Sequence, residues 1–228
     1  MPNDKPVPDG RFMFAFAHDL RTHLRTVLTR IQLVQANAGG QLPEPDRAFL
    51  REAEVAVGDI QSLLSAGVAY CSAAPAENEI ELSLLLQGVL LQRKAMLAEA
   101  GAEVEVANEV KGRVPGALDT VLKELVANAC RFRASDRPLH IRIAARHVGA
   151  SAGGIEIEVS DNGLGVDTAY LEKIFVPFQR LHARGEYPGN GLGLATCRRL
   201  VESWGGTIVA QTSAEGGLNV RVTAPLDP

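Results

Sequence analysis

Two stripes of apolar residues at heptad spacing fill the first third of the chain and restrict it to long, paired helices. The first stripe predicts a helix over residues 11–38, ended by Gly39 and Gly40, and the second predicts another helix after the loop at residues 41–46. Two helices alone bury little apolar surface, so we expect this hairpin, residues 11–74, to form a four-helix bundle as a homodimer. The stripes consist of Met13, Ala17, Leu20, Leu24, Val27, Ile31 and Val34, and of Phe49, Ala53, Ala56, Ile60, Leu63, Gly67 and Tyr70.

His18 is predicted to point away from the first stripe and into solvent. At about 100° per residue it falls about 160° from the mean direction of the stripe, and Thr22 shares its face. An exposed imidazole beside the carboxylate of Asp19 is a reasonable phosphoryl acceptor, with Asp19 orienting a ring proton and Thr22 positioning water. An ordinary surface histidine is the simpler alternative, and the helix alone does not decide between the two.

A second domain is predicted over residues 79–228, after a proline- and alanine-containing linker at residues 74–79. Residues 1–10 hold three prolines and are expected to be a disordered lead. Alternating strands and helices in the second domain predict an α/β sandwich, a mixed sheet with helices on one face. The expected strands are 79–82, 102–108, 139–147, 154–162, 207–212 and 218–223; the expected helices are 83–100 (capped by Ser83 and Gly101), 117–133, 169–174 and 192–204.

Composition excludes several classes of protein. The net charge of −4 gives no indication of binding to nucleic acid or to an anionic membrane. The three cysteines are far apart and form no C-x-x-C pair, so neither a disulfide framework nor a zinc site is indicated. The N-terminus lacks the apolar region of a signal peptide, and the longest apolar stretch, residues 82–91, is about half of what a membrane span needs. We therefore expect a cytoplasmic protein without a membrane span.

The helix predicted at residues 117–133 carries a polar face beside its apolar stripe. Glu124 and Asn128 are spaced i, i+4 and share this face with Arg131. A carboxylate, an amide and a guanidinium in this arrangement could hold a water molecule, a Mg²⁺ ion with its phosphates, and a phosphate group. A solvated charged face is the alternative interpretation.

Two glycine clusters lie between Val159 and Ala195. The first follows Asp161, whose carboxylate could recognise a base, and the second leads into a helix, where backbone N–H groups favour phosphate binding. Taken alone, each cluster is more often a turn than a nucleotide site. The clusters contain Gly163 and Gly165, and Gly189, Gly191 and Gly193.

Five stretches, in this order, resemble the two-component sensor histidine kinases with an ATP-binding domain of the GHKL (Bergerat) type. They resemble the phosphoacceptor box, the N box, the first glycine box, the F box and the second glycine box of that family. The segment 174–208 is especially similar to the kinase cores of phytochrome-like sensors. The five stretches are AHDLRTHLRT (17–26), LKELVANACRFR (122–133), VSDNGLGVD (159–167), IFVPFQR (174–180) and GNGLGLA (189–195).

The resemblance implies a catalytic role for residues of both domains. It makes His18 the phosphoacceptor and Asp19 the acid that assists proton removal. Thr22 matches the position that orients water when such proteins dephosphorylate a partner. Glu124 would position a water or the metal, and Asn128 would ligate Mg²⁺ between the phosphates.

The resemblance also implies a set of nucleotide contacts. Arg131 would contact phosphate, Phe132 would lie near the nucleotide, and Asp161 would accept a hydrogen bond from the adenine amino group. Phe175 and Phe178 would support a lid over residues 179–190. Gly163 and Gly165 would shape the pocket of the base, and Gly189, Gly191 and Gly193 would form the lid hinge and phosphate corner. Arg180 is the remaining residue implied to bind the nucleotide.

The implied activity is ATP-dependent autophosphorylation of His18, followed by transfer to an aspartate on the receiver domain of a response regulator. ATP and Mg²⁺ are the implied cofactors. Two alternatives remain open at this point. One is a non-catalytic phosphotransfer or scaffold protein with a degenerate ATP-binding domain. The other is a GHKL ATPase of the chaperone or mismatch-repair kind, with Glu124 as the base.

Overall fold

The computed structural model shows two compact units, one ending at Ser72 and the other beginning at Ala73. The expected disordered lead falls outside the described residues except for Gly10, which begins the first helix. Most of the expected linker, residues 149–152 and part of the expected lid also lie outside them. The structure describes residues 10–38, 40–73, 78–108, 110–148, 153–181, 187 and 189–226. Within this part of the chain, no helix has the length and apolar character needed to cross a membrane.

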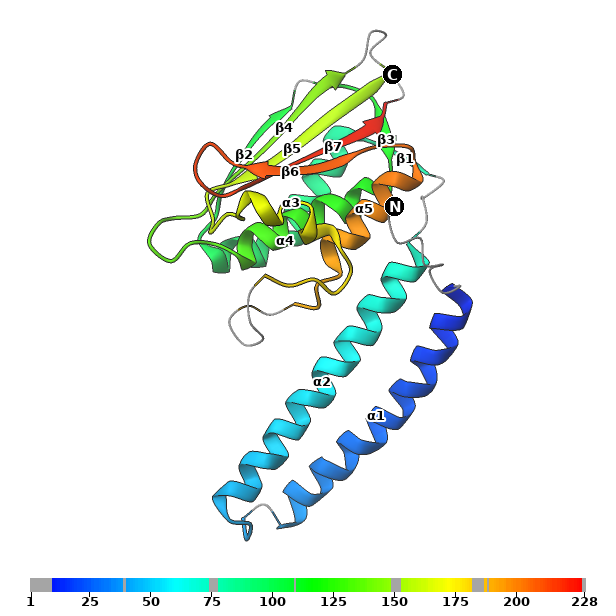
Figure 1. Ribbon diagram of the computed structural model, residues 1–228, viewed down its shortest axis with the longest axis vertical. Coiled ribbons are helices and arrows are strands. Elements are labelled where there is room, and N and C mark those ends of the chain that lie inside the picture. The colour runs from blue at the N-terminus through cyan, green and yellow to red at the C-terminus, as the bar shows by residue number, and fades with distance from the viewer. Residues whose placement is uncertain are drawn as a thin grey trace. The chain divides into compact units, whose positions relative to one another are not determined.

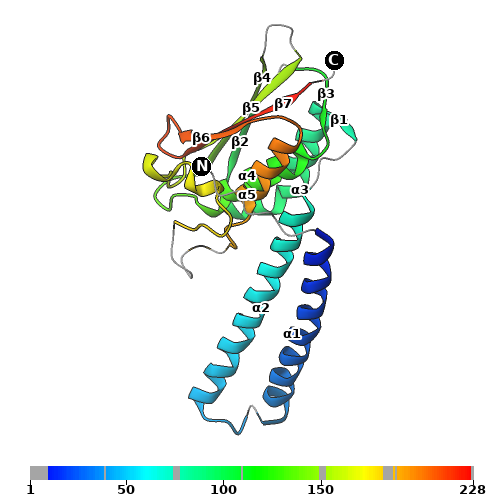
Figure 2. The same cartoon turned by 45° about the vertical axis from the view of Figure 1, so that its right-hand side comes forward.

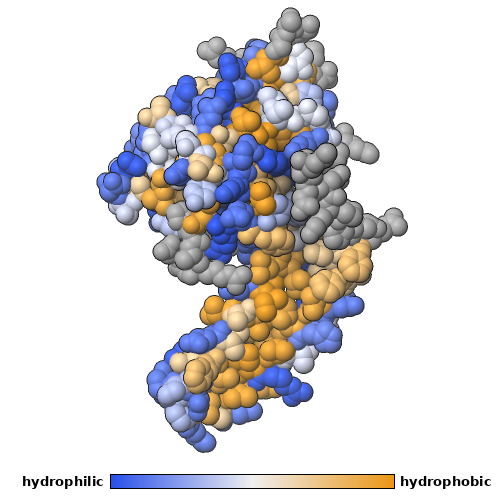
Figure 3. Space-filling model, in the orientation of Figure 1, coloured by the Kyte–Doolittle hydropathy of each residue, from blue (hydrophilic) through white to orange (hydrophobic). Residues whose placement is uncertain are grey.

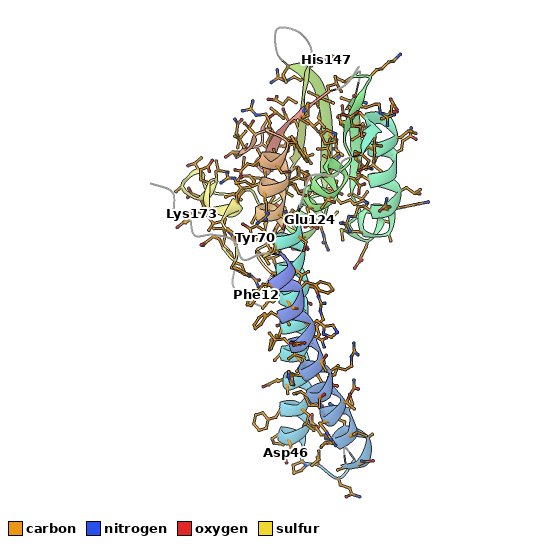
Figure 4. All side chains as sticks on the ribbon, turned by 90° about the vertical axis from the view of Figure 1, so that its right-hand side faces the viewer. Phe12, Asp46, Tyr70, Glu124, His147 and Lys173 are labelled. Carbon is orange, nitrogen blue, oxygen red and sulfur yellow. The ribbon has the colours of Figure 1, made fainter. Side chains whose placement is uncertain are left out.

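The first unit is a hairpin of two long helices, α1 (Gly10–Ala38) and α2 (Glu44–Ser72). The turn between them is fixed by the carbonyl of Ala38, which accepts hydrogen bonds from the backbone N–H groups of Gln41 and Leu42 at 2.9 and 3.0 Å. Phe12 and Asp46 lie at opposite ends of the hairpin, as expected for antiparallel helices (Figure 4). The predicted pair of helices is confirmed.

The apolar stripe predicted for α2 is not the one that packs inside the hairpin. The buried residues of α2 are Val57, Leu64, Gly67 and Cys71, and all but Gly67 lie one residue beyond a predicted position. Phe49 and Ile60, from the predicted stripe, are 65% and 43% exposed. Apolar residues occupy both registers, so a heptad pattern alone cannot tell which face meets α1.

The exposed register leaves an apolar surface on the hairpin, and α1 contributes to it. Ala17 and Ile31 are buried, whereas Val27 and Val34 from the same predicted stripe are 48% and 44% exposed. Apolar side chains accordingly run along the visible face of the two helices (Figure 3).

The second unit contains a five-stranded mixed sheet, and the helices α3, α4 and α5 cover one of its two faces (Figures 1 and 2). The strand order is β2-β4-β5-β7-β6, with β2 parallel to β4 and all other neighbours antiparallel. This is the predicted α/β sandwich. The elements are α3 (Leu82–Ala100), β2 (Glu103–Asn108), α4 (Leu118–Arg131), β4 (His140–Val148), β5 (Gly154–Asp161), α5 (Gly193–Ser203), β6 (Ile208–Thr212) and β7 (Leu218–Pro225).

The sheet alternates between an apolar inner face and a charged outer face. On the inner face, strand residues such as Ile143, Ile157 and Val222 are at most 1% exposed and pack with the helices in one core. On the outer face, Nε2 of His140 lies 2.7 Å from the Glu103 carboxylate on the neighbouring strand, and cross-strand ion pairs join Arg142 to Glu105 and Arg146 to Glu156. Burial of the apolar face against the helices therefore holds the two layers together.

Two local predictions need correction, and one short strand was missed. Ser83 does not cap α3: the helix begins at Leu82, and the Ser83 hydroxyl donates to the Glu81 carboxylate at 2.6 Å. The helix expected at 169–174 is instead two 3₁₀ turns, Thr168–Tyr170 and Lys173–Phe175, because so short a segment does not sustain α-helical hydrogen bonding. A further short strand, β3 (Arg113–Pro115), was not predicted and pairs with β1 (Glu79–Glu81). Gly101 ends α3 in the left-handed region, as predicted (φ 62°).

Candidate functional site

The polar face of α4 is organised around Asn128. This residue is only 9% exposed and lies among mostly apolar neighbours on the helix, so a polar side chain is buried here. Its Oδ1 accepts a hydrogen bond from Arg131 Nη1 at 2.8 Å, so a buried amide that would otherwise be costly is satisfied. The Arg131 guanidinium lies 6.0 Å from the centre of the Phe132 ring. Asn128, Arg131 and Phe132 therefore lie together at the C-terminal end of α4.

Glu124 lies one turn earlier on α4, against the start of α5 (Figure 4). A Cβ atom on Gly193, the first residue of α5, would come 2.6 Å from Glu124 Oε2. A side chain at this position would require the Glu124 carboxylate to move aside. The second glycine cluster and the N-box-like helix are therefore in direct contact.

The end of α4 also contacts the loop that follows β5. The Phe132 carbonyl accepts a hydrogen bond from Leu164 N at 2.9 Å, and a Cβ atom on Gly163 would lie 2.5 Å from this carbonyl oxygen. The absence of a side chain at Gly163 thus permits the close approach. As a result, the end of α4, which carries Asn128, lies against the loop that follows Asp161, a contact that spacing along the sequence could not establish.

Asp161 ends β5 with its carboxylate fixed by two backbone donors. Its Oδ1 accepts hydrogen bonds from Gly163 N at 2.9 Å and from Leu218 N at 3.1 Å. Burial raises the pKa of this carboxyl above its ordinary value, and the two backbone donors oppose the shift only in part. Both of these hydrogen bonds are made to Oδ1 and neither to Oδ2.

The loop after Asp161 is held by contacts that no sequence pattern marked. Asn162 accepts from His140 N at 2.8 Å and donates to the Pro138 carbonyl at 2.9 Å. Arg137 donates to the carbonyls of Asn162 and Gly163 at 2.9 and 3.2 Å. These hydrogen bonds hold the chain where it bends at Gly163, directly after Asp161 and Asn162.

The two ends of the expected lid meet at its base. Phe178 N donates to the Gly191 carbonyl at 2.8 Å, and Gly191 has φ 67°. Phe178 is itself the sole non-glycine residue with positive φ in the described chain (63°), and its side chain is 61% exposed. Phe178 therefore contacts the other end of the expected lid, at Gly191, through its backbone N–H group. Phe175, by contrast, is buried beneath the Arg198 guanidinium, which lies 4.3 Å from the ring centre.

Tyr187 brings the expected lid segment to the end of α4. Its ring centre lies 5.3 Å from that of Phe132, with an angle of 45° between the planes. Its carbonyl accepts a hydrogen bond from Arg180 Nη2 at 2.8 Å. Two residues later, a Cβ atom on Gly189 would lie 3.6 Å from Arg131 Nη1. No sequence pattern pointed to Tyr187 beyond its place between two expected boxes.

His18, Asp19 and Thr22 form a separate group on α1. The His18 and Asp19 side chains are 70% and 81% exposed, and Nδ1 of His18 lies 3.4 Å from Oδ1 of Asp19. The prediction that His18 faces solvent is confirmed. The Thr22 hydroxyl donates to the backbone carbonyl of His18 at 3.2 Å. The structure thus brings the predicted site residues together in two groups, one in each unit.

Comparison with known proteins identifies the class to which this fold and site belong. Residues 113–228 match the family described as histidine kinase-, DNA gyrase B- and HSP90-like ATPases. The match extends over half of the chain and contains Asn128, Asp161 and both glycine clusters. The chain belongs to this ATPase family.

Two of the relatives are a phytochrome and a phytochrome-like protein. The chain is 30% identical to cyanobacterial phytochrome A of Nostoc over 224 residues, which cover 95% of this chain and 28% of that protein. It is also 30% identical to the phytochrome-like protein Cph1 of Synechocystis, covering 95% of this chain and 29% of the relative. The chain therefore spans less than a third of the length of these two relatives.

Solved structures agree on the fold. The crystal structure of full-length ShkA in complex with AMPPNP superposes with a TM-score of 0.70 at 21% identity, over 96% of this chain and 46% of that one. The histidine kinase AdeS of Acinetobacter baumannii gives a TM-score of 0.60 at 18% identity, over 92% of this chain and 98% of that one. The predicted fold class, a helical part followed by a GHKL-type domain with a mixed sheet, is confirmed.

Proposed function

We propose that this chain is an ATP-dependent protein histidine kinase that phosphorylates His18 and passes the phosphoryl group to an aspartate on a response-regulator receiver domain. The observation that carries the proposal is the convergence of Asn128, Arg131, Phe132 and Asp161 at one edge of the second unit, in a chain that also exposes a His18–Asp19 pair. Membership of the ATPase family and similarity to phytochrome-type sensor kinases support it.

In this proposal, Asp161 recognises the adenine base. Its Oδ1 is already engaged by two backbone N–H groups, so Oδ2 accepts from the amino group of the base. Gly163 and Gly165 let the backbone pass close to the carbonyls of Phe132 and Gly216, so the loop beside the proposed base site packs tightly. The phosphates would lie toward Arg131 and the glycines before α5, where backbone N–H groups and a guanidinium favour anions.

The residues of α4 fit a magnesium ion held together with ATP phosphates. Mg²⁺ prefers oxygen ligands and usually takes one or two from protein beside those of the phosphates. Asn128 offers a buried amide oxygen, and Glu124 offers a carboxylate one turn away. Arg131 occupies the Asn128 oxygen in this structure, so it would have to turn away, toward the phosphates. When bound, the ion would neutralise developing charge on the phosphates.

For phosphoryl transfer, His18 needs a free ring nitrogen with a lone pair. A hydrogen bond from Nδ1–H to Asp19 would place that lone pair on Nε2. Nε2 would then form the new bond to the γ-phosphorus, while the bond from phosphorus to the β,γ-bridging oxygen breaks and ADP leaves. Most of the catalytic effect would come from positioning and from electrostatic stabilisation.

The apolar surface of the hairpin supports assembly into a homodimer. Val27, Val34, Phe49 and Ile60 are each 43% to 65% exposed, and they belong to the heptad stripes that predicted a four-helix bundle. Pairing two hairpins would remove these side chains from water. The receiver domain would then dock on the hairpin near His18, with Thr22 available to orient water during dephosphorylation. The cytoplasmic location stays a prediction.

The test is incubation with γ-labelled ATP and Mg²⁺, using wild type, His18→Gln and the matched control His23→Gln on the same helix. Acid-labile, base-stable label in wild type and His23→Gln, but not in His18→Gln, is the expected result. Label that persists without His18 would mean a different acceptor. Nucleotide binding without label would favour the scaffold alternative, and ATP hydrolysis without label would favour the ATPase with Glu124 as base.

A further inference from the structure

Tyr187 forms a ring contact within the proposed nucleotide site that no predicted role explains. Its ring lies 5.3 Å from that of Phe132, tilted by 45°. Aromatic pairs at this separation attract each other beyond the effect of the area they bury. The backbone of Tyr187 is tied separately, through the hydrogen bond from Arg180 to its carbonyl. The ring contact is therefore an interaction of its own and does not follow simply from the course of the chain.

The position of Phe132 gives this contact a consequence for ligand binding. The Phe132 carbonyl bonds to Leu164 N in the loop of Asp161, and its ring lies beside Arg131, so the residue lies between the groups proposed to bind base and phosphate. A base stacked between two rings needs them nearly parallel and about 7 Å apart, twice the stacking distance. The observed pair is closer than this and is tilted. Tyr187 thus covers Phe132 in a way that leaves no room for a base between the rings.

We propose that Tyr187 is an affinity-determining residue that competes with the adenine base for the surface of Phe132. The inference rests on the proposed function, because it assumes that adenine nucleotides bind between Asp161 and α4. A base that packs on the side of Phe132 covered by this contact would require the Tyr187 ring to leave. Loss of the ring would therefore strengthen nucleotide binding, which is the opposite of what removal of a ligand contact does. From the usual strength of an aromatic pair, the gain is roughly two- to tenfold in Kd.

The experiment measures Kd for MgADP and for magnesium tripolyphosphate with the full chain. The variants are Tyr187→Ala, Tyr187→Phe and the control Tyr170→Ala, which removes a 42% exposed tyrosine in contact with Lys173. We expect Tyr187→Ala to bind MgADP roughly two- to tenfold more tightly, and the other two variants to match wild type within about twofold. Tripolyphosphate has no base, so its Kd should not respond to Tyr187→Ala.

The outcomes separate this inference from the proposed function. Unchanged or weaker MgADP binding by Tyr187→Ala, with normal binding by wild type, overturns the competition alone. An equal gain for tripolyphosphate also overturns it, because general loosening of the site would then be the cause. If wild type binds no adenine nucleotide, the proposed function fails and this inference fails with it. Phosphorylation of His18 is not needed for any of these measurements.

Discussion

Adjacent glycines before β7 allow a direct test of how Asp161 is held. Gly217 is buried, and a Cβ atom there would meet both the carbonyl oxygen and Oδ1 of Asp161, and would come 2.6 Å from Gly163 N. Gly216 has no atom within 4 Å of its would-be Cβ, but its φ of 89° strains any other residue. Gly217→Ala therefore disturbs the site sterically, whereas Gly216→Ala adds backbone strain without touching Asp161.

The size of both effects follows from these contacts. With Gly217→Ala, Asp161 must shift by about 0.5 Å or more to relieve the overlap. That shift would break its 3.1 Å hydrogen bond from Leu218 N, at a cost of about 1.5–3 kcal/mol because the acceptor is charged. Loss of a similar bond to the base would raise the Kd for MgADP roughly 10- to 100-fold. Gly216→Ala should cost about 1–2 kcal/mol in stability and leave the Kd within about twofold.

Chemical denaturation and calorimetric titration with MgADP measure the two quantities independently. Both variants should lose stability, and Gly217→Ala alone should lose affinity. Normal affinity in Gly217→Ala, in a protein that is folded by circular dichroism, would refute the role assigned to Asp161. Equal loss of affinity in both variants would show that general destabilisation is the cause.

Three further predictions follow from burial and charge. Because burial raises the pKa of Asp161, protonation should weaken MgADP binding at pH values where an ordinary aspartate is still ionised; titration at decreasing pH should show this step in wild type and not in Asp161→Asn. Leu122→Ala should lower the free energy of unfolding by about 2–5 kcal/mol, since Leu122 is fully buried, whereas Leu91→Ala, at a 73% exposed site on α3, should change it by under about 0.5 kcal/mol in urea denaturation. Val34→Glu on the exposed hairpin face should shift sedimentation from dimer to monomer, while the exposed Gln32→Glu should not; a dimeric Val34→Glu protein would exclude this face as the interface.

The sign of the Asp161 effect on stability is also defined. A carboxyl whose pKa is raised by folding binds protons more tightly in the folded chain, so its ionisation opposes folding. Relative to Asp161→Asn, wild type should therefore lose stability as the pH rises from the unfolded pKa, about 3.9, through the raised folded pKa. If wild type instead gained stability relative to Asp161→Asn as the pH rises through this range, the burial of this carboxyl would be contradicted.

The sequence predicts those parts of the fold that depend on local patterns. Periodicity identifies both hairpin helices, and alternation identifies the long strands, because burial of one face imposes those periods. The register of α2 could not be predicted in this way, since Ile60 and Leu64 are equally apolar and only the partner helix distinguishes them. Ser83 likewise has a hydroxyl that could cap a helix, but this hydroxyl donates a hydrogen bond to the Glu81 carboxylate instead.

The same distinction between local patterns and contacts of distant segments applies to the candidate site. Glycine spacing and the polar face of α4 could be used to predict candidate residues, because these features are local. Their convergence depends on contacts between distant segments, such as Phe132 with Leu164 and Tyr187 with Phe132. No spacing rule gives such contacts for a single sequence. The supporting role of Arg137 was invisible for the same reason, since its acceptors lie on a loop 25 and 26 residues later in the chain.

The hydrogen bond from Leu218 to Asp161 also has a consequence for the time at which the site forms during synthesis. Asp161 lies in the middle of the second unit, but one of its two backbone donors is the first residue of β7. A ribosome that has released the chain only as far as α5 would expose every residue proposed to touch the nucleotide, without the strand that fixes the carboxylate. Nucleotide binding should therefore begin late, after β7 has paired with β5, so that unfinished chains do not bind ATP.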